Sequence, residues 1–220
     1  MYKFFVQQLV DKFQHSLVGY ELLMRRRDGD QWVLPVDFAT IPVEDVVNAL
    51  LEASELLKGK VPIIALNLNR DQLLNIDLLN AIVDCKDKIV PLKLVIEITE
   101  EESSQKIDDE LILDRVKFFW NNDIQIALDD VSNGENHFDG IVNLIPFASE
   151  IKFALQNDHL DFSAPEVQRL ISNWQDIANQ HHIRFVLEGI ETSTDDVTAD
   201  RLGIAYRQGY YYGKPYLVDS

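Results

Sequence analysis

Short apolar segments alternate along the chain with longer amphipathic stretches, and this pattern gives the first structural expectation. The apolar segments are rich in β-branched residues, as buried strands are, and we expect strands at residues 17–23, 63–68, 92–98, 124–129, 149–153 and 183–188. The stretches between them predict helices at about 43–58, 75–85, 108–122, 165–181 and 194–202. Strands that alternate with helices are typical of an α/β fold with a parallel sheet.

A parallel sheet of this kind either stays open or closes into a barrel. No Gly-x-Gly-x-x-Gly or Gly-x-x-x-x-Gly-Lys-Ser/Thr sequence follows an expected strand, so the nucleotide-binding signatures of open sheets are missing. At least six repeated units favour a closed (β/α)8 TIM-like barrel, although 220 residues is compact against a typical length of about 250. No Gly/Ser linker marks a boundary, so we expect residues 1–220 to form a single domain.

Composition and charge narrow the choice of partners. Apolar residues make up 46% of the chain, and 20 Lys and Arg residues stand against 37 Asp and Glu residues, for a net charge of −17. Such a chain lacks the basic face that duplex DNA, duplex RNA or an anionic membrane would need. The single cysteine, Cys85, cannot form an internal disulfide, and we find neither a signal-peptide core nor an apolar run of the ~20 residues that span a bilayer. We therefore expect a cytoplasmic protein.

Polar side chains occupy the same place in successive apolar segments. They lie late in a segment or directly after it, at Glu21, Asn67, Glu97, Asp129, Asp130, Lys152 and Glu188. The carboxyl ends of parallel barrel strands meet at one rim, where barrel enzymes carry their catalytic residues. A ring of Glu, Asn and Asp oxygens suits Mg²⁺, Mn²⁺ or Ca²⁺. No His-Glu-x-x-His or Gly-x-Ser-x-Gly sequence is present, which counts against a zinc protease and a serine hydrolase.

These positions belong to seven motifs that occur in a familiar order. The motifs are Tyr20–Arg25, Leu66–Asn69, Ile96–Glu100, Ala127–Asp130, Ile151–Ala154, Leu187–Thr192 and Gln208–Pro215. From about residue 19 to residue 215, the chain resembles the EAL-domain family of bacterial cyclic di-GMP phosphodiesterases. The resemblance implies a barrel whose first strand is antiparallel. It also implies cleavage of one phosphodiester of cyclic di-GMP to give linear pGpG.

The resemblance also implies a role for each matching side chain. Four residues would bind a first Mg²⁺ or Mn²⁺ ion, namely Glu21, Asn67, Glu97 and Asp129. Asp129, Asp130 and Glu188 would address a second ion or its waters, and Ca²⁺ would substitute or inhibit. Lys152, Glu188 and Asp130 are the expected catalytic side chains, with Lys152 positioning the attacking water. Arg25 would pair with a substrate phosphate, Gln208 would support the site, and Glu100 would hold the loop after the aspartates.

Two departures from the family pattern keep other interpretations open. The family sequence Asp-Asp-Phe-Gly-Thr-Gly-Tyr-Ser is replaced by Asp129–Asn136, which lacks the Phe and the first Gly. The family's Lys-x-Asp becomes Lys152–Ala154, which removes a carboxylate near the second metal. Three interpretations follow: an active phosphodiesterase, a catalytically weak relative that binds cyclic di-GMP or a protein partner as a regulator, or a metal-dependent hydrolase of another phosphodiester. In the family the loop after the aspartates contributes to dimerisation, so the resemblance also implies a homodimer.

Overall fold

Eight strands close into a barrel in the computed structural model, which describes residues 1–99, 107–131, 138–155 and 161–218. The barrel strands are β1 (Tyr2–Asp11), β2 (Ser16–Asp28), β4 (Ile63–Leu68), β5 (Lys93–Ile98), β6 (Gln125–Leu128), β7 (Glu150–Ala154), β8 (Arg184–Glu188) and β9 (Tyr206–Arg207). Neighbours from β2 and β4 through to β9 are parallel, and β1 closes the ring by pairing antiparallel with both β2 and β9. The expected barrel with its antiparallel first strand is confirmed.

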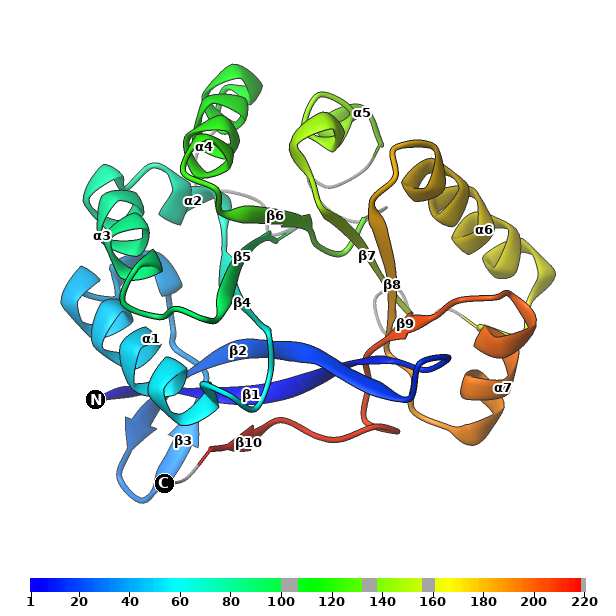
Figure 1. The fold of residues 1–220 in the computed structure, drawn as a ribbon, viewed down its shortest axis with the longest axis horizontal. Helices are drawn as coiled ribbons and strands as arrows, with labels where there is room; N and C mark the ends of the chain where they lie inside the picture. The colour runs from blue at the N-terminus through cyan, green and yellow to red at the C-terminus, as the bar shows by residue number, and fades with distance from the viewer. Residues whose placement is uncertain (100–106, 132–137, 156–160, 219–220) are drawn as a thin grey trace.

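Helices surround the parallel strands on the outside (Figure 1). The longer ones are α1 (Val43–Leu57), α3 (Ile76–Lys86), α4 (Asp109–Asn121), α6 (Pro165–Gln180) and α7 (Ser193–Arg201). Short elements complete the fold, namely β3 (Gln31–Val33), β10 (Tyr216–Leu217), α2 (Arg70–Leu73), α5 (Phe138–Ile141) and 3-10 turns at Phe38–Thr40 and Ile145–Phe147. The five expected helices end within one residue of their expected limits. No helix in the described part of the chain is long and apolar enough to cross a membrane.

The structure adds a long first strand that the sequence pattern did not reveal. β1 (Tyr2–Asp11) buries Phe4, Val6 and Leu9, but polar residues such as Gln7 interrupt its apolar run. Gln7 is itself 9% exposed. β1 lies between β2 and β9, so it also pairs with the two-residue strand β9, which is too short to stand out in a sequence.

The side chains inside the barrel change character along the strands. Alternate residues of a strand face the same side, so the residue two positions after an inward-facing one also faces inward. Ala65, Val95 and Ala127 form a small apolar cluster separate from the main core. Two residues further along these segments come Asn67, Glu97 and Asp129. On these three segments, small apolar side chains therefore form one layer inside the barrel, and polar side chains form the layer above it.

Helix α7 is attached to the barrel mainly by charge. Its buried residues are Asp196 and Ala199, whereas the other long helices bury apolar faces. Arg207 on β9 is fully buried, and its Nη1 and Nη2 atoms lie 2.6 Å from carboxylate oxygens of Asp196 and Asp200. Lys12 and Tyr212 also donate hydrogen bonds to Asp196.

This network predicts a specific acid dependence of stability. Burial acts to raise the pKa of Asp196, but hydrogen bonds from Lys12, Tyr212 and Arg207 bring it below the usual value. The stabilisation is therefore present above the unfolded pKa of about 3.9, and it is lost as pH falls through the lower folded pKa. Asp196→Asn should cost about 1.5–3 kcal/mol at neutral pH, the range for hydrogen bonds to charged groups.

Thermal melts followed by circular dichroism across the acid range will test this. The gap in melting temperature between wild type and Asp196→Asn should shrink as pH falls. Asp30→Asn, which alters an exposed carboxylate, is the control and should change melting little at any pH. A gap of constant size through the acid limb would contradict the assignment.

Candidate active site

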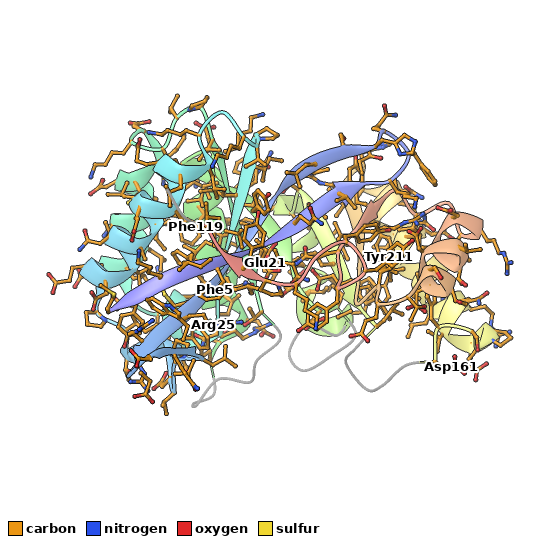
Figure 2. The ribbon with its side chains drawn as sticks, turned by 90° about the horizontal axis from the view of Figure 1, so that it is seen from below. Phe5, Glu21, Arg25, Phe119, Asp161 and Tyr211 are labelled. Atoms are coloured by element: carbon orange, nitrogen blue, oxygen red, sulfur yellow. The ribbon has the colours of Figure 1, made fainter. Side chains whose placement is uncertain are left out.

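The strand ends bring the expected polar side chains together at one end of the barrel. They come from β2 (Glu21), β4 (Asn67), β5 (Glu97), the residues after β6 (Asp129 and Asp130), β7 (Lys152), β8 (Glu188) and the residue after β9 (Gln208). A cleft of about 340 Å³ is lined by several of them, including Glu21, Asp130, Glu188 and Gln208. Figure 2 shows Glu21 near the middle of the molecule, with Arg25 further along the same strand and beside Phe5.

Lys152 is the buried centre of this group. Its side chain is 1% exposed, and its Nζ atom lies 3.0 Å from Glu97 Oε2, 3.1 Å from Asp129 Oδ1 and 2.7 Å from Glu188 Oε1. Burial alone would lower the pKa of Lys152, but the surrounding carboxylates raise it well above its ordinary value. Lys152 therefore remains an ammonium ion that holds three strand ends together.

Glu21 is held by two amide side chains rather than by Lys152. Asn67 Nδ2 donates to Glu21 Oε1 at 2.6 Å, and Gln208 Nε2 donates to Glu21 Oε2. The other end of the Asn67 amide, Oδ1, is buried and accepts no hydrogen bond within the described residues. A buried oxygen of this kind is normally satisfied, so its position suggests a ligand that accepts electron pairs.

The carboxylates of the rim outnumber the one buried ammonium group, Lys152, that neutralises them. Burial raises the pKa of Glu97 and Glu188 well above the ordinary value, although Lys152 opposes the shift. Burial also raises the pKa of Asp129, again against the effect of Lys152. Negative neighbours add to the shift in each case. The ionised cluster would thus gain free energy from a further positive charge.

The donor atoms fit a hard divalent cation by their chemistry. All are carboxylate or amide oxygens, which Mg²⁺, Mn²⁺ and Ca²⁺ prefer, and Asn67 Oδ1 supplies an oxygen with no other described partner. Three carboxylates are directed at Lys152, however, and no three Asp, Glu, His or Cys side chains are grouped as ready-made ligands within the described ranges. The expected ligand set therefore remains a prediction.

Asp130 reaches the cleft because the chain turns sharply after β6. Its φ of 47° lies in the left-handed region, which Asp tolerates better than most residues. Backbone hydrogen bonds fix the residues on either side, from Asp129 N to Ile98 O at 3.1 Å and from Val131 N to Lys152 O at 3.0 Å. The turn places successive carboxylates, Asp129 and Asp130, on the lining of one cleft.

Arg25 lines this cleft and makes no ion pair with the residues that the structure describes. Its Nη1 donates to Met24 O at 2.9 Å and its guanidinium lies over the Phe5 ring, but it makes no ion pair with any described residue. Burial lowers the pKa of Arg25, although Glu21 acts in the opposite direction. A half-buried guanidinium that has no ion pair within the described ranges is suited to an anionic group such as a phosphate.

Other expected features fall beside the site or outside the described residues. Ala154 is 1% exposed and pairs in register with Glu188, so no carboxylate comes from this position. Glu100 and residues 132–136 of the altered stretch Asp129–Asn136 lie outside the described residues. Sequence reasoning did not find the adjoining cleft of about 250 Å³, lined in part by Leu34, Phe38 and Gln72, because no motif marks these positions.

Comparisons with known proteins identify the family. The EAL domain model matches residues 4–215. The chain belongs to the EAL domain family. It is 24% identical over 234 residues to the probable cyclic di-GMP phosphodiesterase PdeG of Escherichia coli K12, covering 96% of this chain and 44% of that protein. The chain therefore spans less than half the length of that EAL relative.

Solved structures of other proteins share the fold. The PaMucR phosphodiesterase in complex with cyclic di-GMP superposes with a TM-score of 0.77 at 22% identity, covering 98% of this chain and 97% of that one. BlrP1 of Klebsiella pneumoniae with calcium and cyclic di-GMP gives a TM-score of 0.81 at 22% identity, covering 100% and 57%. Its manganese complex gives 0.80 at 22% identity, covering 98% and 56%. These likenesses confirm the barrel fold.

Replacing Lys152 tests how far the site depends on its buried ammonium. Lys152→Met should cost about 3–5 kcal/mol at neutral pH, because it leaves buried carboxylates without their partner. Lys93→Met, which replaces an exposed lysine on β5, is the matched control and should melt almost as wild type does. Added Mn²⁺ should recover part of the melting temperature of Lys152→Met. A variant as stable as wild type would show that Lys152 does not hold the strand ends.

Proposed function

We propose that this EAL protein is a divalent-cation-dependent phosphodiesterase that hydrolyses cyclic di-GMP to linear pGpG. The supporting observation is the oxygen-rich rim around Lys152, with the guanidinium of Arg25 lining the adjoining cleft. Carboxylates and an amide oxygen suit the cations, and Arg25 suits the phosphate. Membership of the EAL family and the names of its relatives support cyclic di-GMP as the substrate.

The proposal gives each oxygen donor a place in cation binding. Glu21, Asn67, Glu97 and Asp129 would hold a first Mg²⁺ or Mn²⁺ ion, and Asp130 and Glu188 would hold a second. Bound divalent cations supply Lewis-acid chemistry, because they polarise a phosphoryl oxygen and favour the ionisation of water. The carboxylates that contact Lys152 would also contact the cations, and Lys152 would keep those carboxylates in place.

The remaining chemistry belongs to the side chains of the cleft. Arg25 would hold a non-bridging phosphate oxygen with its planar guanidinium. Lys152 would donate a hydrogen bond to the attacking water, and the Glu188 carboxylate would accept a proton from that water. The water oxygen forms a new bond to phosphorus as one ester P–O bond breaks, and the leaving sugar oxygen takes up a proton from solvent water. Gln208 would keep Glu21 oriented throughout.

A second candidate function rests on Ala154. This buried alanine lies beside Glu188 in the β7–β8 register, where the resemblance would place a carboxylate near the second cation. Without that carboxylate, a second cation would bind more weakly while the rest of the cleft stays intact. The alternative is a protein that binds cyclic di-GMP as a regulator and hydrolyses it slowly.

Incubation of the purified protein with cyclic di-GMP and Mn²⁺ or Mg²⁺, followed by chromatography for pGpG, tests the proposed activity. Ala154→Asp should raise kcat about 10-fold or more, because it would strengthen an interaction made in the transition state. Ala148→Asp, which adds a carboxylate before β7, is the control and should not raise kcat. Absence of pGpG from both wild type and Ala154→Asp, with cyclic di-GMP bound, would favour the regulatory function instead.

Arg25→Ala should weaken cyclic di-GMP binding by about 1.5–3 kcal/mol, the range for hydrogen bonds to charged groups. Arg26→Ala is the matched control, because Arg26 is the next residue on β2 and lies 3.7 Å from Asp28 in an exposed ion pair. Titration calorimetry with each variant gives the comparison. Unchanged affinity with a lowered melting temperature would make Arg25 a structural residue.

A further inference from the structure

Asp196 on α7 holds both ends of the segment that carries Gln208. Arg207, directly before Gln208, places its Nη1 atom 2.6 Å from Asp196 Oδ1. The Tyr212 hydroxyl, four residues after Gln208, donates to the same oxygen. Lys12, directly after β1, donates to the other oxygen of Asp196. A single carboxylate thus joins both flanks of one short segment to α7 and β1.

The segment between these flanks has little freedom. Gln208 N donates to Leu187 O at 3.0 Å, and Gln208 O accepts from Ile190 N at 3.1 Å. Gly209 has a φ of 152°, and a Cβ atom there would lie 2.1 Å from Ile190 O. Successive residues of a strand point to opposite faces, so Arg207 enters the layer beneath α7 while Gln208 enters the barrel. There Gln208 donates to Glu21.

We propose that Asp196 is a positioning residue of the active site, which fixes Gln208 through Arg207 and Tyr212 and thereby orients the Glu21 carboxylate. The link to cation binding and catalysis rests on the proposed function. No described atom of Asp196 lines the cleft, so it acts only through these neighbours.

The chemistry of the contact favours positioning over simple attachment of α7. Burying an arginine costs desolvation free energy. Apolar side chains of similar volume would often hold α7 against the barrel at least as well as the Arg207–Asp196 ion pair does. The guanidinium is instead held by directional bonds, from Nε to Ile204 O at 2.8 Å and from Nη1 to Asp196 O at 2.9 Å. Bonds in several directions fix the orientation of Arg207, and with it the chain direction at Gln208.

Two variants break this connection to different degrees. Asp196→Ala removes the acceptor that Arg207, Tyr212 and Lys12 share. Tyr212→Phe removes one hydrogen bond and keeps the buried ion pair, so it can still be measured if Asp196→Ala does not fold. Asp200→Ala is the matched control. It takes a carboxylate from the same guanidinium on the same helix, but Asp200 does not contact Tyr212 or Lys12.

The first readout needs no ligand. In ¹⁵N NMR spectra, the side-chain amide of Gln208 can be assigned by its loss in Gln208→Ala. Tyr212→Phe and Asp196→Ala should shift this signal and speed its hydrogen exchange about 10-fold, while Asp200→Ala leaves it near its wild-type position. An unchanged Gln208 signal in both Tyr212→Phe and a folded Asp196→Ala would overturn the proposal.

The second readout is a double-mutant cycle on Mn²⁺ affinity, measured by calorimetry. Asp196→Ala, or Tyr212→Phe if the former does not fold, should weaken Mn²⁺ binding about 10-fold, as loss of residues that orient metal ligands does. The same substitution should add little in a Gln208→Ala background. Equal losses in the two backgrounds would show that Asp196 does not act through Gln208. If wild type binds neither Mn²⁺ nor cyclic di-GMP, the proposed function fails, and the NMR signal alone decides the role of Asp196.

Discussion

The rim of the barrel depends on one buried ammonium, Lys152, which lies within 3.1 Å of carboxylates from three other strand ends. Without a positive charge at this point, buried carboxylates so close together would repel one another and take up protons. Lys152 corrects only part of the imbalance, because the pKa values of Glu97 and Glu188 stay well above normal. In the folded barrel the carboxylates therefore carry more negative charge than Lys152 can neutralise. This uncompensated charge is the physical basis of the proposed cation site.

The register of the strands turns this local charge balance into a site. Inward-facing positions alternate along each strand, so the small layer of Ala65, Val95 and Ala127 is followed by a polar layer at the rim. A cavity of about 10 Å³ lies between the two layers and is lined by Ala65 and Val95 from the apolar layer and by Glu21 and Glu97 from the polar one. Several of the buried charged side chains, Glu97, Asp129, Lys152 and Glu188, therefore lie together at one end of the barrel.

Much of this could be predicted from the sequence, because the relevant signals are local. Apolar segments that end in Asn67, Glu97 or Glu188 reveal both the strand and the inward-facing donor. β1 was missed because Gln7 breaks its apolar pattern, although in the barrel that side chain is buried. The contacts of Lys152 with its three partners, and those of Asp196, connect strands and helices that are far apart in the sequence. No local spacing of residues therefore predicts them.

The central claim is that the carboxylate rim binds a divalent cation, and a calorimetric titration of Mn²⁺ into wild type and Glu97→Gln tests it most directly. Glutamine keeps the size of the side chain and can still accept a hydrogen bond from Lys152, but it removes one negative charge from the proposed ligand set. We predict saturable binding to wild type and an affinity at least about 10-fold weaker in Glu97→Gln, which corresponds to about 1.4 kcal/mol. Equal affinities, or no binding to either protein, would contradict the account.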